Sequence, residues 1–221
     1  MLELLELKHS PYCIPIVRML EGCSVEFKRR EIPNWDRREL GKLTGGKYYQ
    51  VPVLVDGTSV IYDLPDDPYR VARHVDARHC GGRFFPVEWT GVHEILIGEF
   101  EDRFEGAGFK LTDIHYVPTM ADPGERGMVI RHKERRFGVG CLEDWTKNQE
   151  ALRSALESLL EPIDRRLGAA SFLLGNDPVF ADFALYGVLG NYTYKGWNHL
   201  PARMKDLRGW YDRMTHWRAV N

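Results

Sequence analysis

Short apolar runs separated by turn residues fill the first third of the chain. The leucine-rich run 2–7 predicts a buried strand, and the run 25–32 predicts a second one. Between them, Ser10 and Pro11 are typical of a helix N-cap and a first helical position, and the apolar residues that follow end at Gly22. A strand, a helix and a strand in this order predict a βαβ unit with parallel strands.

Pro15 is an irregularity in that predicted helix. If Ser10 is the cap, Pro15 is the fifth helical residue and removes one backbone hydrogen bond, so we expect a distorted first turn. A short helix over 34–43 and a glycine-containing loop then lead to the next strand.

Residues 49–63 predict the segment around which the N-terminal part is organised. Two β-branched stretches meet at Asp56-Gly57, a pair that suits a tight hairpin. Pro52 stands at the start of the first stretch, where a residue without an N–H can be accommodated. If the bond between Val51 and Pro52 is cis, the turn presents the backbone N–H and C=O of Val51 as a clamp for an extended ligand. A helix over 68–76 completes the order β-α-β-α-β-β-α.

Beyond residue 86 the β signals fade and helical periods take over. The clearest period covers 142–167, where apolar residues recur on one face, and Pro162 is expected to kink or end that helix. The segment 180–190 is apolar nearly all round, which marks the centre of a helical domain. Glycines and prolines break up the pattern over 107–128.

The domain organisation follows from this change of pattern. We expect an N-terminal α/β domain over 1–77, a linker over 78–86 and an all-helical domain over 87–221. Further helices of the second domain are expected over 87–106, 128–137 and 204–218.

Composition and charge narrow the function classes. The 221 residues are 43% hydrophobic and 28% charged, as in an ordinary globular protein, and a net charge of −2 gives no field that attracts nucleic acid or an anionic membrane. We see no signal-peptide pattern and no apolar run long enough to span a membrane. The four cysteines stand far apart and none of the eight histidines has metal-ligand spacing, so we expect reduced thiols, no metal and a cytoplasmic location.

Four short segments, in this order and spacing, resemble the cytosolic glutathione transferase superfamily. Ser10-Pro11-Tyr12-Cys13 is similar to the redox loop of the thioredoxin fold, with serine in place of its first cysteine. Gln50 to Leu54 is similar to the cis-proline segment, and Tyr62-Asp63 falls where an acidic residue is usual. The run from Leu174 to Phe183 is similar to the capping segment and central helix of the family's second domain. The resemblance implies a thioredoxin-like α/β domain followed by an all-α helical-bundle domain.

The resemblance also implies glutathione as co-substrate, a small apolar electrophile as second substrate, and a homodimer. It places Ser10 and Cys13 as candidate catalytic residues. The residues that it implies for glutathione binding are Tyr12, Gln50, Val51, Pro52, Asp63 and Leu64.

The chemistry of these residue types agrees with that implication. Glutathione is an extended peptide that can pair with the backbone of Val51 as one more strand. Its thiol would then lie near Ser10 at a helix N-terminus, where the macrodipole and a hydroxyl donor favour the thiolate. Because helix N-termini lower thiol pKa values from about 8.5 to roughly 3.5–7.5, ionisation near neutral pH is expected.

Two positions depart from the family pattern. Leu64 stands where serine is usual, so a hydroxyl bond to glutathione is lost, although the backbone N–H of Leu64 is expected to stay available. A hydrogen bond to a charged group contributes about 1.5–3 kcal/mol, so we expect weakened glutathione binding. Val179 replaces a hydroxyl-bearing helix cap, which is expected to lower stability by about 1 kcal/mol.

Three alternatives remain open at this level. Cys13 can support glutathione-dependent thiol–disulfide reduction if its thiol is exposed, and Tyr12 can supply the hydroxyl instead of Ser10. The loss at Leu64 also fits a non-catalytic binding protein. The candidates for a second-substrate pocket are Trp89, His93, His115 and Tyr116, and those for the glycine carboxylate of glutathione are Arg37, Arg38 and Lys47.

Overall fold

The computed structural model describes residues 1–219. Its N-terminal part holds a four-stranded sheet of order β2-β1-β3-β4. Strand β1 pairs in parallel with β2, and the β1–β3 and β3–β4 pairs are antiparallel, so the predicted βαβ unit and hairpin are both confirmed. The bounds of its elements are β1 Leu2–Glu6, α1 Cys13–Gly22, β2 Lys28–Glu31, α2 Arg38–Leu43, β3 Val53–Asp56, β4 Ser59–Tyr62 and α3 Arg70–His79.

The leucine run of β1 is buried because helices cover both faces of the sheet. Leu4 packs on the side of α1 and α3, whereas Leu5 packs with Leu40 of α2. Strand β2 is shorter than the predicted 25–32, since it forms an edge of the sheet and its four residues are exposed.

Helix α1 begins at Cys13, two residues later than the sequence predicts. The carbonyl of Ser10 still accepts the N–H groups of Cys13 and Ile14, both at 3.1 Å. Pro15 is therefore the third helical residue, within the first turn, where N–H groups have no partner inside the helix. The distortion expected at Pro15 does not follow, because no helical hydrogen bond is lost there.

Helix α3 runs to His79, two residues into the segment expected to be a linker. The carboxylate of Asp76 then accepts the N–H groups of Arg83 at 2.9 Å and of Phe84 at 3.0 Å. Phe84 itself is fully buried, so the connecting segment is fixed against the body of the protein.

The second part is all helical, and its bounds correct several expectations. Gly108 does not break a helix, because one continuous helical segment runs from α4 through the π-helical turn η2 into α5. Helix α8 continues through Pro162 instead of ending there. The elements are η1 Val87–Trp89, α4 Thr90–Glu99, η2 Phe100–Phe104, α5 Glu105–Tyr116, η3 Val117–Thr119, α6 Pro123–Phe137, α7 Cys141–Lys147, α8 Gln149–Leu167, α9 Phe180–Tyr192, η4 Tyr194–Gly196 and α10 Lys205–His216.

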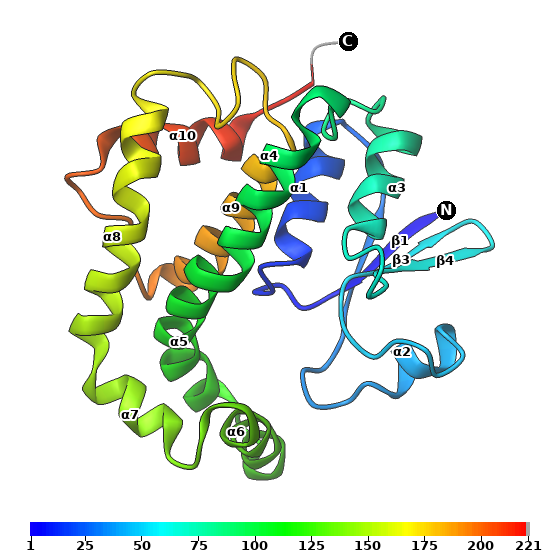
Figure 1. The fold of residues 1–221 in the computed structure, drawn as a ribbon. Coiled ribbons are helices and arrows are strands. Elements are labelled where there is room, and N and C mark those ends of the chain that lie inside the picture. Colours follow the sequence, from blue (N-terminus) through cyan, green and yellow to red (C-terminus); the bar gives the residue numbers. More distant parts are fainter. Residues whose placement is uncertain (220–221) are drawn as a thin grey trace.

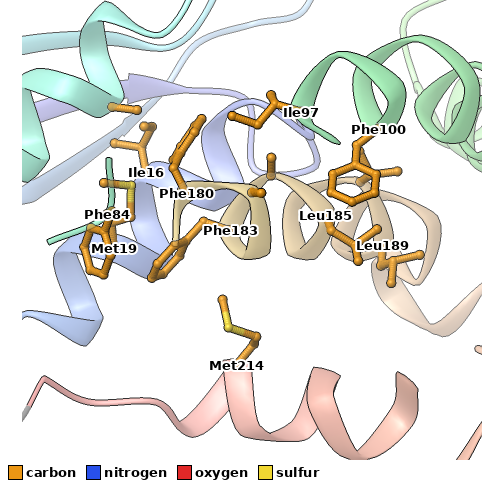
Figure 2. Close-up of a cluster of buried hydrophobic side chains, with 14 of the residues drawn as sticks. Ile16, Met19, Phe84, Ile97, Phe100, Phe180, Phe183, Leu185, Leu189 and Met214 are labelled. Atoms are coloured by element: carbon orange, nitrogen blue, oxygen red, sulfur yellow. The ribbon is translucent and has the colours of Figure 1, made fainter. Parts of the chain in front are cut away.

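Helix α9 is the centre of the helical part, as its all-round apolar sequence predicts. It lies beside α1, which separates it from the sheet (Figure 1). Figure 2 shows Phe180 and Phe183 of α9 near Ile16 and Met19 of α1, and one apolar cluster includes all four residues. The core therefore continues from one part of the chain into the other.

Val179 caps α9 without a side-chain acceptor, as its residue type requires. Asp182 partly compensates, because its Oδ2 accepts the N–H of Val179 at 3.1 Å. Its Oδ1 accepts the N–H of Leu173 at 3.0 Å and the indole N–H of Trp210 at 2.9 Å. Burial raises the pKa of Asp182 to about 6 despite these three donors. None of the helices described within residues 1–219 is long and apolar enough to cross a lipid bilayer.

Candidate active site

A pocket lies where the loop before α1 meets α3, η2 and α9. Three of the predicted site residues, Tyr12, Pro52 and Asp63, line it together. Its cavity volume is about 30 Å³, within about 410 Å³ of space that includes open solvent. The other lining residues are Pro11, Pro15, Ile16, Pro68, Tyr69, Ala72, Glu101, Phe180, Ala184 and Val188. A mostly apolar pocket with a few converging polar groups has the character of a small-molecule site.

The bond between Val51 and Pro52 is cis, as the clamp hypothesis requires. The side chain of Val51 is buried with Leu5 and Val53. Its backbone N–H and C=O have no hydrogen-bond partner among residues 1–219, so they remain free to pair with an extended ligand. Gln50 is exposed beside it.

Ser10 is buried, with 6% of its surface exposed, and does not line the pocket. Its Oγ accepts the N–H of Tyr12 at 3.3 Å, and its hydroxyl also acts on the thiol of Cys13. Asn191 of α9 fixes the same loop by donating to the carbonyl of His9 at 2.6 Å. Ser10 thus stands one residue from the pocket wall at Pro11.

Cys13 does not meet the condition for redox chemistry, because its side chain is fully buried. Burial raises the pKa of its thiol to about 12, although hydrogen bonds from the backbone of Leu7 and the hydroxyl of Ser10 act in the opposite direction. A thiol that is neither exposed nor ionised is a poor nucleophile. The structure therefore argues against Cys13 as a catalytic residue.

Tyr12 is the exposed member of the Ser10–Cys13 segment, with 42% of its surface accessible. Partial burial in the pocket, together with the negative charges of Glu105 and Glu101, raises the pKa of its phenol. Tyr12 therefore keeps its proton at neutral pH and can donate a hydrogen bond into the pocket.

Asp63 stands at the N-terminus of α3, where its Oδ1 accepts the N–H of Val71 at 2.9 Å. Burial raises the pKa of Asp63 to about 7, and the neighbouring Asp67 adds to this effect. A cation that approached Asp63 would favour its ionised form.

Leu64 does not offer a free N–H, contrary to the expectation. Its N–H donates to the carbonyl of Asp67, and the N–H of Asp67 donates back to Leu64, both at 3.0 Å. A ligand carboxylate would find neither a hydroxyl nor a free amide donor at this position.

Sequence analysis missed a second acid that lines the pocket. Glu101 lies in the π-helical turn η2 and lines the pocket with Tyr69, whose hydroxyl donates to Glu101 Oε2 at 3.3 Å. Burial raises the pKa of Glu101 to about 7. Single π turns occur often at functional sites, but the apolar pattern of this helix does not predict a π turn.

Four residues were expected to line a pocket for the second substrate: Trp89, His93, His115 and Tyr116. None of them lines the pocket described here. His93 has a structural role, because its Nε2 accepts the N–H of Ala181 at the start of α9 at 2.8 Å. The apolar wall comes instead from Phe180, Ala184 and Val188 of α9.

Of the three basic residues proposed to bind a carboxylate, Arg37 differs in having a buried nitrogen without a partner within residues 1–219. Arg38 pairs with Asp36 at 2.5 Å, and Lys47 is exposed. Arg37 donates through Nη2 to Asn34 Oδ1 at 3.0 Å, while its buried Nη1 has no partner within residues 1–219. A buried guanidinium nitrogen without an acceptor is a candidate donor for a carboxylate.

Sequence and structure comparisons bear on the fold. Residues 144–213 match the family model described as glutathione S-transferase, C-terminal domain. No curated protein sequence matches the chain.

Solved structures share the fold over nearly the full length. Glutaredoxin 2 from Salmonella typhimurium, in complex with glutathione, is 18% identical, with a TM-score of 0.74 over 100% of this chain and 96% of that chain. The theta class glutathione S-transferase from Xanthomonas axonopodis pv. citri, with glutathione bound, is 16% identical, with a TM-score of 0.66 over 96% and 91%. Poplar glutathione transferase F1 is 12% identical, with a TM-score of 0.66 over 97% and 92%.

These matches show the fold: a thioredoxin-like domain joined to an all-helical domain, as in the cytosolic glutathione transferases. The resemblance read from the sequence is confirmed at this level.

Proposed function

We propose that this protein binds glutathione and transfers its thiolate to a small apolar electrophile. The observation that carries the proposal is that Tyr12, the cis-Pro52 segment and Asp63 line one pocket together with apolar residues of α9. The first three suit a peptide thiol, and the apolar wall suits a second substrate.

Glutathione would lie along the unpaired backbone of Val51, as an added strand. Its ammonium group would approach Asp63, whose raised pKa of about 7 would fall when the cation binds. Glu101 lies on the same pocket and is a second carboxylate for this ammonium. Arg37, through its free Nη1, is the candidate for the glycine carboxylate.

The thiolate would lie at the N-terminus of α1, where the helix dipole stabilises negative charge. Ser10 is the proposed donor to the sulfur, and the phenol of Tyr12 is the second donor from the same loop. The thiol proton passes to solvent, the sulfur forms a bond to the electrophilic carbon, and the leaving group departs with its electron pair. The protein contributes orientation and charge stabilisation.

Conjugation of glutathione to an aryl halide tests the proposal. We expect Ser10→Ala to lower kcat/KM roughly 10- to 100-fold, the effect of losing a hydrogen bond to a charged group. Cys13→Ser is the matched control from the same loop and should leave the rate unchanged. A Ser10→Ala enzyme with full activity, together with an impaired Tyr12→Phe enzyme, would move the role to Tyr12. No conjugation in the wild-type protein would reject the transferase function.

Thiol–disulfide reduction through Cys13 is the weaker enzyme hypothesis, because that thiol is buried with a raised pKa. A glutathione mixed disulfide as substrate tests it directly. Reduction that disappears in Cys13→Ser would restore this hypothesis.

A non-catalytic binding protein is the second candidate function, and the internal hydrogen bonds of Leu64 favour it. Without donors at this position, glutathione loses contacts that are worth about 1.5–3 kcal/mol each. Titration calorimetry decides between the transferase and the non-catalytic binding protein. No heat and no thermal shift at millimolar glutathione would favour the non-catalytic binding protein.

Self-association belongs to the same proposal. Val87, Val92 and Ile95 are large apolar side chains that stay exposed on η1 and α4. We expect a second copy of the chain to cover them, and light scattering on the wild type and on Ile95→Glu tests this. The cytoplasmic location stays a prediction.

A further inference from the structure

We propose that Asp56, His74 and His79 form a binding site for a divalent transition metal such as zinc. Nε2 of His74 lies 2.8 Å from Asp56 Oδ2, and Nε2 of His79 lies 3.0 Å from the same oxygen. One ligand atom of each residue lies within 4.8 Å of the other two. Two imidazole nitrogens and a carboxylate oxygen are a donor set found in zinc and non-haem iron sites.

The fold creates this cluster, which the sequence spacing hides. Asp56 is the last residue of β3, and His79 is the last residue of α3. Because α3 packs against the sheet, the end of a strand and the end of a helix meet. None of the three residues lines the pocket between α1, α3 and α9, so this site is separate from the proposed glutathione site.

The three side chains are ready to accept a cation. Between 22% and 28% of each side chain is exposed, so an ion can enter from solvent and keep water at its open positions. Oδ2 of Asp56 is the acceptor that both imidazoles share. In a tetrahedral zinc complex with bonds of about 2.0–2.1 Å, ligand atoms stand roughly 3.3 Å apart, so His74 and His79 need only small movements away from Asp56.

Metal binding also requires a specific proton arrangement. A neutral imidazole that coordinates through Nε2 carries its proton on Nδ1. The metal would therefore replace the two Nε2–H···O hydrogen bonds at Asp56 Oδ2. Without metal, the same cluster joins the hairpin to α3 through hydrogen bonds alone.

The test uses the full chain after treatment with a chelator. We expect calorimetry with zinc chloride to give one site per chain, and cobalt(II) to give the visible bands of a nitrogen and oxygen site. His74→Gln, His79→Gln and Asp56→Asn should each weaken zinc binding at least about tenfold, since loss of even an outer partner of a metal ligand costs 10- to 100-fold. His216→Gln, an exposed histidine next to Asp212, is the control and should bind as the wild type does.

A second measurement separates lost binding from lost folding. Zinc should raise the melting temperature of the wild type and of His216→Gln, and should not raise that of the three site variants. No zinc binding by the wild type would overturn the proposal. So would unchanged affinity in His74→Gln and His79→Gln, or cobalt bands that show thiolate ligation, which would place the metal at cysteines instead.

Discussion

Gly187 of α9 lies directly against the backbone of Pro11. A Cβ atom at position 187 would stand 2.2 Å from the Pro11 carbonyl oxygen and 2.5 Å from Cγ of Pro15. Helix α9 can therefore approach the start of α1 only because residue 187 has no side chain. The position of the loop that carries Ser10 and Tyr12 depends on this contact.

We accordingly expect Gly187→Ala to lower the free energy of unfolding by about 1–3 kcal/mol, the cost of overpacking a core. Gly98→Ala is the control on α4, where a Cβ would meet nothing within 4 Å and alanine favours the helix. Urea unfolding of both variants makes the comparison. Equal stability of Gly187→Ala and wild type would mean that the two helices can separate without cost.

Asp182 is expected to be the most sensitive polar residue of the helical part. Asp182→Ala would leave three N–H donors of Leu173, Val179 and Trp210 without their acceptor. Because each buried donor left unsatisfied costs about 1–3 kcal/mol, we expect a loss of at least about 3 kcal/mol. Trp210→Tyr keeps a large aromatic side chain and alters only one of the three donors. Its loss in the free energy of unfolding should be smaller than that of Asp182→Ala in the same denaturation experiment.

The pocket acid gives stability a pH dependence with a definite sign. The pKa of Glu101 is about 7 in the folded state, against an ordinary value of 4.5, so the folded state holds its proton more tightly. The stabilising contribution of the protonated acid is complete below pH 4.5 and is lost as the pH rises through 7. Glu101→Gln cannot lose a proton there, so its stability relative to wild type should rise by roughly 1–2 kcal/mol between pH 5 and pH 8.

Tyr69→Phe is the matched variant for this measurement. The hydroxyl of Tyr69 lowers the pKa of Glu101, so its removal should move the stability change to higher pH. Parallel stability curves for wild type and Glu101→Gln would contradict the assignment of this titration to Glu101.

Thiol labelling tests the burial of Cys13 without any substrate. All four cysteines are free, but Cys13, Cys80 and Cys141 are buried, and the hydrogen bond from Cys80 lowers the pKa of the half-buried Cys23. We expect one fast-reacting thiol in the native protein and four after unfolding. Cys23→Ser should remove the fast phase, whereas Cys13→Ser should keep it; the reverse pattern would reopen the reductase hypothesis.

Glutathione affinity should respond to position 64. Leu64→Ser restores a hydroxyl next to Asp63, and we expect it to strengthen glutathione binding about tenfold in calorimetry. Pro65→Ala, next along the chain, adds no donor and serves as the control. An unchanged dissociation constant for Leu64→Ser would mean that the ligand does not reach this turn.

Most of the fold could be predicted from local signals. The leucine run of β1, the turn at Gly57 and the all-apolar α9 each specify their own structure, because burial and backbone preference act within a few residues. Helix ends are less predictable: α1 begins at Cys13, with Tyr12 at the N-cap position, and α8 continues through Pro162.

The candidate site was only partly predictable, because local sequence signals do not show contacts between distant elements. The family resemblance pointed to Tyr12, Pro52 and Asp63, which line one pocket together. It could not show that Cys13 points into the core, that Leu64 bonds to Asp67, or that a π turn directs Glu101 to the pocket. Those facts depend on contacts between elements that are far apart in the sequence.

The apolar cluster that joins Leu54 of the sheet to Phe183 and Trp210 of the helices has a thermodynamic consequence. Because both parts contribute to one hydrophobic core, they are expected to unfold together. Cutting the chain at the connecting segment would expose apolar surface on each fragment. We expect calorimetry to record one endotherm whose van't Hoff and calorimetric enthalpies agree. The two parts of the fold would then unfold as one cooperative unit.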